Sequence, residues 1–571
     1  MSRSSVRAAP TPHSLLFGLL AVAVMITGWA GMPSPAPGAH GVLAPAMSVE
    51  SRPNIVVVMA DDMRTDDLRF MPSVRSLVAG KGLTFRNSFS PYPLCCPARA
   101  TFLTGRYAHN HRVYSHKSPW GFQAFDDRAT MATALRRSGY QTGFIGKYLN
   151  GYGVQRSRVT GQSSFRYVPN GWTDWYAAVD RPRGSSYRSG GTYNYFHTLF
   201  NVNGRIDDTH RGQYQTNVLG GFARRLVTKY HRSPKPFFMY LSAVAPHFGG
   251  PKESDDPGLV LRTDGRHTDI DTPARPRWVR GRFDARITRA SGLPSNGGPS
   301  EADVSDKPRP MRSQPELSRA ERHAVRILTR QRAESLYVLD LEVKRLVERL
   351  KATGEYRNTI LMFTSDNGYF LGEHRQRQGK IKPHEPSLRV PFLISGRGVP
   401  HGVRFDPVTT PGVTATIADL AGVRMPFPAD GLSVRSSFRG DRGWTVPVVT
   451  EGLVGGSVFP KDALDKAPGF HDARNTIGVR TPRWKYVRYS TGDGELYDLD
   501  ADPNELTNLV KDPAYDDVRG ALHAMWLTYK DCVGASCRAE MSDEFQRTPA
   551  QNAAGTNEQS RGVQRRYGYW R

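Results

Sequence analysis

The chain has 571 residues, which is more than one typical hydrophobic core organises, so we expect one large domain with a smaller companion. Its 55 glycines and 41 prolines indicate many loops and argue against a long helical array. The formal net charge of +25 favours anionic ligands. No basic helix, zinc finger or aromatic RNA-binding motif accompanies that charge, so we expect no nucleic-acid partner.

The N-terminus is typical of an export signal. Arg3 and Arg7 precede the apolar run of residues 15–31, and a small-residue A-x-A pattern follows at residues 44–46. We therefore expect residues 1–46 to be a signal peptide with a small-residue linker, and the protein to be secreted. The apolar run is also near the shortest length that spans a bilayer, so a retained membrane anchor is the alternative. No other membrane contact is expected.

Four short apolar runs predict strands of a mostly parallel sheet that is buried on both faces. They are residues 54–60, 140–146, 237–245 and 359–365. Each run is followed by acidic, basic, amide or imidazole side chains, which can bind ligands or act in catalysis. Open α/β sheets bind ligands at the carboxyl ends of their strands. These side chains are Asp61 and Asp62, Lys147, His247, and Asp366 with Asn367. The sequence thus predicts an α/β domain over residues 51–440 with a site at one sheet edge.

Between these strands the chain is helical in one place and irregular in another. Apolar residues spaced by three and four from Leu336 to Leu350 predict a scaffold helix that ends before Gly354. Residues 251–315 follow His247, lack periodicity and are rich in Arg, Asp, Gly, Ser and Pro, so we predict a long irregular insertion. The insertion either borders the mouth of a site or is disordered, and its residues do not decide between the two.

Short alternating segments predict a small antiparallel sheet in a C-terminal subdomain, residues 441–541. Cys532 and Cys537 are close enough in the chain to form a small disulfide loop in an oxidising compartment. The tail, residues 542–571, is polar and rich in Gln and Arg, so we expect it to be frayed apart from its aromatic end.

The stretch PLCCPARATFLTG, residues 93–105, holds the other two cysteines and predicts the start of a helix. Pro97 suits an early helical position, and Gly105 supplies the stop. Cys95 then lies at the helix N-terminus, where exposed N–H groups favour an anion, and Arg99 lies over the same end. Together they predict a cradle for a tetrahedral oxyanion such as phosphate or sulfate.

The spacing C-x-P-x-R followed by T-G resembles the signature of the sulfatase family. The residues that match it are Cys95, Pro97, Arg99, Thr104 and Gly105. The resemblance implies that a formylglycine-generating enzyme oxidises Cys95 to Cα-formylglycine. The hydrate of that aldehyde offers one hydroxyl for attack on sulfur and a second for the release of sulfate. Cys96 stands at the variable position of the signature, and we expect it to be a small buried thiol.

A hard divalent cation is needed beside such a nucleophile, because the charge of the sulfate must be neutralised for the attack. Asp61, Asp62, Asp366 and Asn367 form an oxygen-only set, which favours Ca²⁺, with Mg²⁺ possible, over zinc. The resemblance assigns metal ligation to these four residues together with the formylglycine at Cys95. As isolated pairs, DD and DN are more often turn or capping residues.

Three further residues complete the anion cradle by resemblance: Lys147, His247 in APHF, and Lys380 in GKIKPHEPSLRVP. Lysine charges neutralise sulfate, and an imidazole can protonate the leaving alcohol oxygen. Lys382 is a near rival to Lys380, and only the register of the following RVP separates them.

The chain departs from the family pattern two residues after Lys147. Many sulfatases have a histidine there, whereas this chain has Leu149, followed by Asn150. Asn150 is the candidate for the group that hydrogen-bonds the nucleophile or the leaving group on that side.

The likeness extends from Asn54 to about Arg538, and its motifs look most like those of the N-acetylglucosamine-6-sulfatase branch. The family fold is alkaline-phosphatase-like. The resemblance therefore implies a catalytic domain over residues 51–440, with a large mostly parallel sheet flanked by helices, and a small C-terminal domain with an antiparallel sheet.

The function implied is that of a secreted, calcium-dependent sulfatase that acts on a sulfated carbohydrate or small sulfate ester, most of all on a sulfated amino sugar of the glucosamine 6-sulfate type. A phosphoester or phosphonate hydrolase of the same superfamily is one alternative, because the cradle would hold phosphate nearly as well. A noncatalytic protein that binds acidic glycans through its basic surface is the other.

Overall fold

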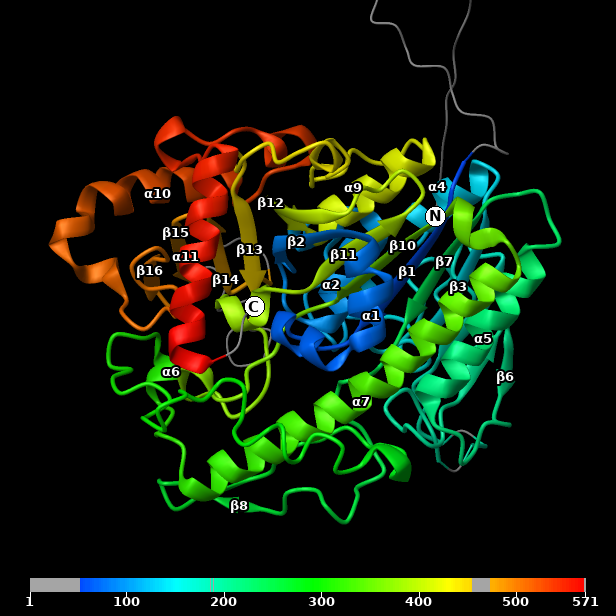
Figure 1. The fold of residues 1–571 in the computed structure, drawn as a ribbon, viewed down its shortest axis with the longest axis horizontal. Helices are drawn as coiled ribbons and strands as arrows, with labels where there is room; N and C mark the ends of the chain where they lie inside the picture. The colour runs from blue at the N-terminus through cyan, green and yellow to red at the C-terminus, as the bar shows by residue number, and fades with distance from the viewer. Residues whose placement is uncertain (1–51, 185, 188, 454–472, 569–571) are drawn as a thin grey trace, which may run out of the picture. The chain divides into compact units, whose positions relative to one another are not determined.

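Two β-sheets organise the computed structural model, which describes residues 52–184, 186–187, 189–453 and 473–568 (Figure 1). The predicted signal peptide and linker, residues 1–46, lie outside the described residues. Within the part that is described, no helix combines the length and the apolar character needed to cross a membrane.

The larger sheet has ten strands, and its central strands are parallel. In spatial order they are β12 (Gly402–Thr409), β2 (Gly82–Phe89), β11 (Phe392–Gly396), β10 (Thr359–Ser365), β1 (Asn54–Ala60), β7 (Phe237–Ser242), β3 (Gln141–Lys147), β4 (Asp174–Ala178), β5 (Phe200–Val202) and β6 (Arg205–Asp207). The four predicted strands are confirmed as β1, β3, β7 and β10, although β7 ends at Ser242 rather than at residue 245. β11 pairs antiparallel with both of its neighbours.

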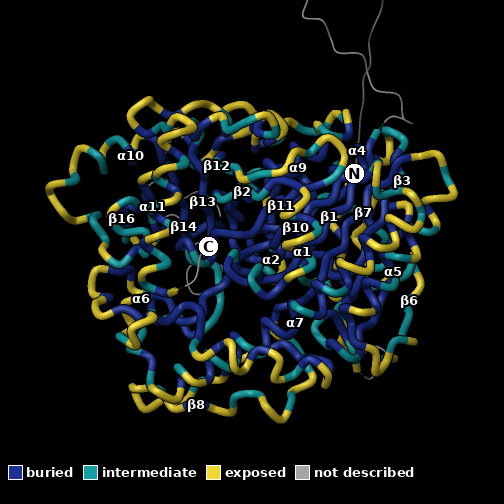
Figure 2. Tube along the Cα trace, viewed as in Figure 1, coloured by how far each residue is buried: buried dark blue, intermediate teal, exposed yellow. Residues whose placement is uncertain are grey.

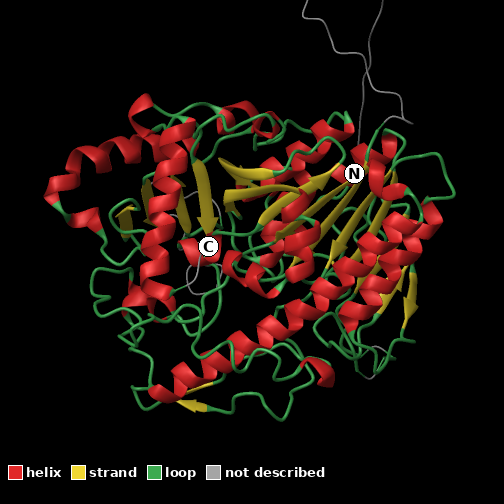
Figure 3. Ribbon diagram, in the orientation of Figure 1, coloured by secondary structure: helices red, strands yellow, loops and turns green. Residues whose placement is uncertain are grey.

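Helices cover both faces of this sheet, so its central strands β1, β7 and β10 are buried on both sides (Figures 2 and 3). Val56 and Val58 of β1 pack in one hydrophobic core, and Val57 and Met59 pack in the other. The first core contains α1 (Pro72–Leu77), α5 (Gln215–Tyr230) and α7 (Arg319–Ala352). The second contains α2 (Cys95–Thr104), α4 (Met131–Arg137) and α9 (Thr410–Ala421). The predicted scaffold helix is confirmed as α7.

The smaller sheet is an antiparallel meander of β13 (Val448–Gly452), β14 (Thr476–Arg480), β15 (Trp484–Tyr489) and β16 (Gly494–Asp498). The helix α10 (Asp516–Tyr529) packs against it through Trp526, which donates a hydrogen bond to the carbonyl of Ile477. Cys532 and Cys537 form the predicted disulfide. The described part of the chain therefore has the predicted α/β architecture with a small C-terminal antiparallel sheet.

The insertion at residues 251–315 is irregular but packed. Its regular elements are the two-residue strands β8 (Val260–Leu261) and β9 (His267–Thr268), one 3-10 turn, and α6 (Arg309–Arg312). Arg275 is completely buried, and its Nε lies 2.9 Å from Oε2 of Glu334 in α7. The insertion is thus held against α7 by this buried ion pair, which argues against the alternative that residues 251–315 are disordered.

The expectation of a frayed tail is wrong. Residues Pro549–Tyr567 form α11, which begins at the capping residue Thr548. Its buried face is polar, and Thr556 accepts a hydrogen bond of 2.8 Å from Asn87 of β2. Because the helix is held by hydrogen bonds rather than by an apolar stripe, its sequence lacks the hydrophobic periodicity that predicts a packed helix.

Candidate active site

The structure brings all nine predicted site residues together at the carboxyl edge of the larger sheet. β7 and β10 flank β1 in parallel, so the loops that follow these strands meet. The loops and the end of β3 contribute acidic, amide, imidazole and lysine groups, and α2 contributes a thiol and a guanidinium. The residues are Asp61, Asp62, Cys95, Arg99, Lys147, His247, Asp366, Asn367 and Lys380.

Cys95 is the first residue of α2 and is completely buried. Its Sγ lies 3.2 Å from Oδ1 of Asp61 and 3.0 Å from Nζ of Lys380. Burial and the charge of Asp61 raise the pKa of this thiol well above its ordinary value. Cys96 is also buried, but its Sγ contacts the carbonyl of Asn150 at 3.7 Å. The two neighbouring thiols therefore face different surroundings.

Basic side chains neutralise the acidic ones. Nε of Arg99 donates to Oδ2 of Asp366 at 2.9 Å, and Lys147 pairs with Asp61. Burial alone would raise the pKa of Asp61, but the charges of Lys147 and its neighbours hold it well below its usual range. Burial, together with the charge of Asp61, raises the pKa of Asp366 to about 6. The site is thus a buried network of opposite charges in which Ser242 also accepts a hydrogen bond from Arg99.

Two oxygens of this network suit a hard cation. Nδ2 of Asn367 donates to Oδ1 of Asp62 at 2.6 Å and to the carbonyl of Gly368 at 2.8 Å. Among the described residues, Oδ1 of Asn367 and Oδ2 of Asp62 are buried without a hydrogen-bond partner. Buried polar oxygens are costly without partners. These two unpartnered oxygens fit a hard cation. Among the described residues, the potential ligand atoms of Asp61, Asp62, Cys95 and His247 lie within 4.8 Å of one another, a group that includes sulfur and nitrogen as well as oxygen and does not include the predicted ligand Asp366.

The structure places Lys380, and not Lys382, in the site. Nζ of Lys380 contacts both Cys95 and Asp62. Nζ of Lys382 instead lies 5.9 Å from the centre of the Phe370 ring, and burial lowers its pKa to about 8.

His247 presents one ring nitrogen to the acidic group. Its Nε2 lies 3.7 Å from Oδ2 of Asp62, and its Nδ1 lies 2.7 Å from the carbonyl of Phe248. Because a carbonyl only accepts, the neutral ring carries its proton on Nδ1. Burial lowers the pKa of His247 to about 4.

Tyr193 belongs to this site and was not predicted. Its ring centre lies 4.9 Å from Nζ of Lys147 and 4.7 Å from the centre of the His247 ring. Nδ2 of Asn150 donates to the Tyr193 hydroxyl at 2.6 Å, whereas Leu149 packs in the hydrophobic core. Asn150 therefore reaches the site through Tyr193. Only the departure from the family pattern near Lys147 pointed toward this region, and no pattern marked Tyr193.

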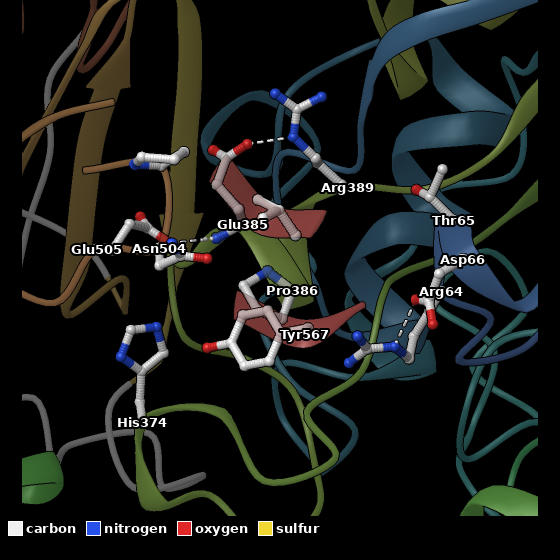
Figure 4. A pocket seen from close by; sticks show the side chains of 12 residues that line it. Arg64, Thr65, Asp66, His374, Glu385, Pro386, Arg389, Asn504, Glu505 and Tyr567 are labelled. Atoms are coloured by element: carbon white, nitrogen blue, oxygen red, sulfur yellow. Dashed lines mark hydrogen bonds and ion pairs between the residues drawn. The ribbon is translucent and has the colours of Figure 1, made fainter. Parts of the chain in front are cut away.

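A separate cavity of about 30 Å³ lies elsewhere and contains none of the nine residues (Figure 4). Its walls include Arg64, Glu385 and Tyr567, the last from α11. Glu385 lies at the start of α8 (Glu385–Leu388), accepts a hydrogen bond from Arg389 and pairs with Lys485 of β15 at 2.8 Å. These contacts hold α8 against the smaller sheet. We therefore interpret this cavity as a gap in the packing between them and not as a ligand site.

The fold and the site together define an α/β protein with a buried network of acidic and basic side chains at the carboxyl edge of its larger sheet. The model of the family described as Sulfatase matches residues 53–423, and the chain belongs to this family. A second model, N-sulphoglucosamine sulphohydrolase, C-terminal, matches residues 464–531. The protein is accordingly a sulfatase-family hydrolase of sulfate esters with an alkaline-phosphatase-like fold.

Characterised relatives are similar along most of the chain. An N-acetylglucosamine-6-sulfatase from Capra hircus is 28% identical over 526 residues, which cover 85% of each chain. An arylsulfatase from Volvox carteri is 28% identical over 536 residues, covering 86% of this chain and 76% of the relative.

Solved structures share the fold. A protein in complex with its substrate D-glucosamine-2-N,6-O-disulfate superposes with a TM-score of 0.59 at 19% identity, covering 85% of this chain and 98% of that one. A phosphonate monoester hydrolase from Silicibacter pomeroyi also superposes with a TM-score of 0.59 at 19% identity, covering 87% and 99%.

Proposed function

We propose that the protein is a secreted sulfatase that hydrolyses sulfate monoesters of sulfated amino sugars or glycans, of the glucosamine 6-sulfate type. The nucleophile in this proposal comes from Cys95, matured to Cα-formylglycine by a formylglycine-generating enzyme after export through residues 1–46. The observation that carries the proposal is the position of the Cys95 thiol at the start of α2, against Asp61 and Lys380. The similarity to N-acetylglucosamine-6-sulfatases supports the substrate class.

A metal fits the oxygen-rich side of the site. The residues that would hold Ca²⁺ or Mg²⁺ are Asp61, Asp62, Asp366 and Asn367, together with the matured residue 95. When bound, the cation would act as a Lewis acid beside the sulfate. The formylglycine hydrate would supply two hydroxyls on one carbon, one to attack sulfur and one to drive the release of sulfate.

The remaining residues of the chain handle charge and protons. Lys147 and Lys380 lie on either side of the acidic pair and would neutralise the sulfate oxygens, while Arg99 fixes Asp366. Nε2 of His247 faces the site and is unprotonated in the neutral ring, so the imidazole would first accept a proton there and would then donate it to the leaving alcohol oxygen. The positive end of α2 favours negative charge at the same point.

The test combines mass spectrometry with turnover. We expect the peptide that contains Cys95 to carry an aldehyde in the secreted protein, and glucosamine 6-sulfate to be hydrolysed with loss of activity on chelation and recovery with Ca²⁺. Cys95→Ala should abolish multiple turnover, while the matched variant Cys96→Ala should retain most of it, because the Cys96 thiol faces the carbonyl of Asn150 and packs in the hydrophobic core.

An unaltered thiol in an active enzyme, or the opposite ranking of the two variants, would contradict the proposed nucleophile. Faster turnover of a phosphate or phosphonate ester than of every sulfate ester tested would favour the phosphoester alternative. Binding of acidic glycans with no hydrolysis of any ester would favour the noncatalytic one.

A further inference from the structure

An exposed aromatic side chain stands at the outer side of His247. Phe248 follows His247 in the chain and is 40% exposed, although large hydrophobic side chains are usually buried. Its ring stacks on His247 with centres 4.2 Å apart, and it lies nearly parallel to Tyr193 at 6.4 Å. The three rings form an aromatic wall whose inner members contact the site and whose outer member faces solvent.

This aromatic wall is fastened from two directions. On one side, the Tyr195 hydroxyl donates to the carbonyl of His247 at 2.7 Å, and the Tyr195 amide donates to the carbonyl of Gly250 at 2.8 Å. On the other side, the Gly249 amide donates to the carbonyl of Thr272 in the insertion at 3.0 Å. Three segments that are distant in sequence therefore lie side by side at residues 193–195, 247–250 and 272–274.

Gly249 makes this close approach possible. A Cβ at Gly249 would lie 2.4 Å from the carbonyl oxygen of Tyr193, which is too close for any side chain. The backbone that carries Phe248 is therefore packed directly against the backbone of Tyr193.

Phe248 also forms one wall of a cavity of about 110 Å³ that the insertion completes. The apolar part of the lining comes from Pro251, Pro257 and the buried Ile270. The polar part comes from Lys252, Asp256, Asp271 and Thr272, with the backbone of the two glycines. An aromatic and apolar surface with a few polar groups is the usual composition of a small-molecule site.

The charged side chains of this cavity disfavour the binding of an anionic group such as a further sulfate. Lys252 donates to Asp269 at 3.1 Å, so its ammonium is already paired. Asp256 accepts a hydrogen bond from Thr272 at 2.9 Å. Asp271 is exposed, and its carboxylate takes part in no hydrogen bond or ion pair with another described residue, so it is an available acceptor. The cavity therefore offers hydrogen-bond acceptors to a neutral or amino-bearing group rather than a cradle for sulfate.

We propose that Phe248 and the cavity closed by residues 251–272 form a carbohydrate subsite, which takes a pyranose ring attached to the ester that the site cleaves. The C–H face of the ring stacks on Phe248, and its hydroxyl or amino groups donate to Asp271. The inference rests on the proposed sulfatase function and gives a role to the insertion, which the chemistry of the site does not need.

The kinetic test compares a sugar ester with an ester that lacks sugar hydroxyls. In Phe248→Ala and in Asp271→Asn, the KM for glucosamine 6-sulfate should rise about fivefold to tenfold, the loss expected for one stacking contact or one charged hydrogen bond, while kcat changes less than about twofold. For 4-nitrophenyl sulfate, Asp271→Asn should leave KM unchanged, because this ester has no hydroxyl to donate.

Leu261→Ala is the matched control for Phe248→Ala. Leu261 is 52% exposed on the same insertion but does not line the cavity, so its variant should behave like the wild type with both esters. Wild-type KM values for the sugar in both cavity variants, or equal losses on both esters in Asp271→Asn, would overturn the subsite.

A binding measurement separates this inference from the proposed function. If the wild type hydrolyses neither ester, the sulfatase proposal fails, and calorimetric titration of glucosamine into the wild type and the two cavity variants still decides the subsite. Weaker binding in both variants than in the wild type and in Leu261→Ala supports it. No binding, or equal binding by all four proteins, rejects it.

Discussion

Two lysines at nearly the same place in the chain have opposite surroundings. Lys380 contacts the Cys95 thiol and the Asp62 carboxylate, whereas Lys382 lies near the ring of Phe370. The difference follows from the backbone at Ile381, whose φ of 87° turns the two side chains away from the extended alternation of a strand. Two residues of the same type therefore differ in their contacts because the backbone places Lys380, and not Lys382, in the site.

We expect Lys380→Ala to lower kcat/KM for a sulfate ester by about a hundredfold or more, because a preorganised charge beside the reacting group is lost. Lys382→Ala is the control and should stay within about fivefold of the wild type. Steady-state kinetics on both purified variants, with circular dichroism to verify folding, makes the comparison. Loss of activity in Lys382→Ala alone would show that the other lysine serves the site.

At the scale of elements, α11 is held by polar contacts. Nε2 of Gln559 donates to the carbonyl of Pro482 and to Oδ1 of Asp500, both at 2.9 Å, and the side chain is buried. Its neighbour Glu558 is partly exposed and accepts a hydrogen bond from Arg561 in the same helix. We expect Gln559→Ala to lower the free energy of unfolding by about 1–3 kcal/mol and Glu558→Ala to leave it unchanged, as measured by calorimetry. Equal stability of the two variants would mean that α11 is not docked by these bonds.

The secondary-structure elements differ in how well the sequence alone predicts them. The bounds of β1 and β10 were predicted to the residue, because a strand buried on both faces is a continuous apolar run that polar residues end abruptly. The same regularity placed Asp61 and Asp366 at the site edge. α11 escaped prediction because its buried residues are Asn552, Thr556 and Gln559, which look like a solvated face.

Tyr193 escaped prediction for a different reason. It reaches Lys147 and His247 from a loop that no local pattern describes, and the backbone of that loop is held by the pairing of the next residue, Asn194, with Gly250. Contacts of this kind depend on which loops the fold brings together, and a single sequence does not encode that as a motif.

At the scale of the whole molecule, a buried carboxylate joins the smaller sheet to the helix α3 (Ala108–His111). Glu451 of β13 accepts hydrogen bonds from the Ala108 amide at the start of α3, from His109 and from Arg474. Burial alone would raise the pKa of Glu451, but His109 and Arg474 lower it from 4.5 to about 2. Because the folded pKa is depressed, this contribution of about 3 kcal/mol is complete above pH 4.5 and is lost as the pH falls toward 2.

We therefore expect the melting temperature to fall between pH 5 and pH 3 by less in Glu451→Gln than in the wild type, although the variant melts lower at pH 7. Calorimetric scans of both proteins across this range measure the difference. An identical acid dependence would mean that other carboxylates govern acid unfolding.

The central place of β1 has a consequence for how the protein is made. Among the described strands, β1 is the first to leave the ribosome, yet Val57 lies between Tyr240 of β7 and Met362 of β10. The hydrogen bonds that Asp62 makes with Asp366 and Asn367 can therefore form only after residues 366 and 367 have been synthesised. A nascent or truncated chain that ends before residue 359 keeps an open, apolar strand edge, which is the kind of surface that chaperones bind and that otherwise aggregates.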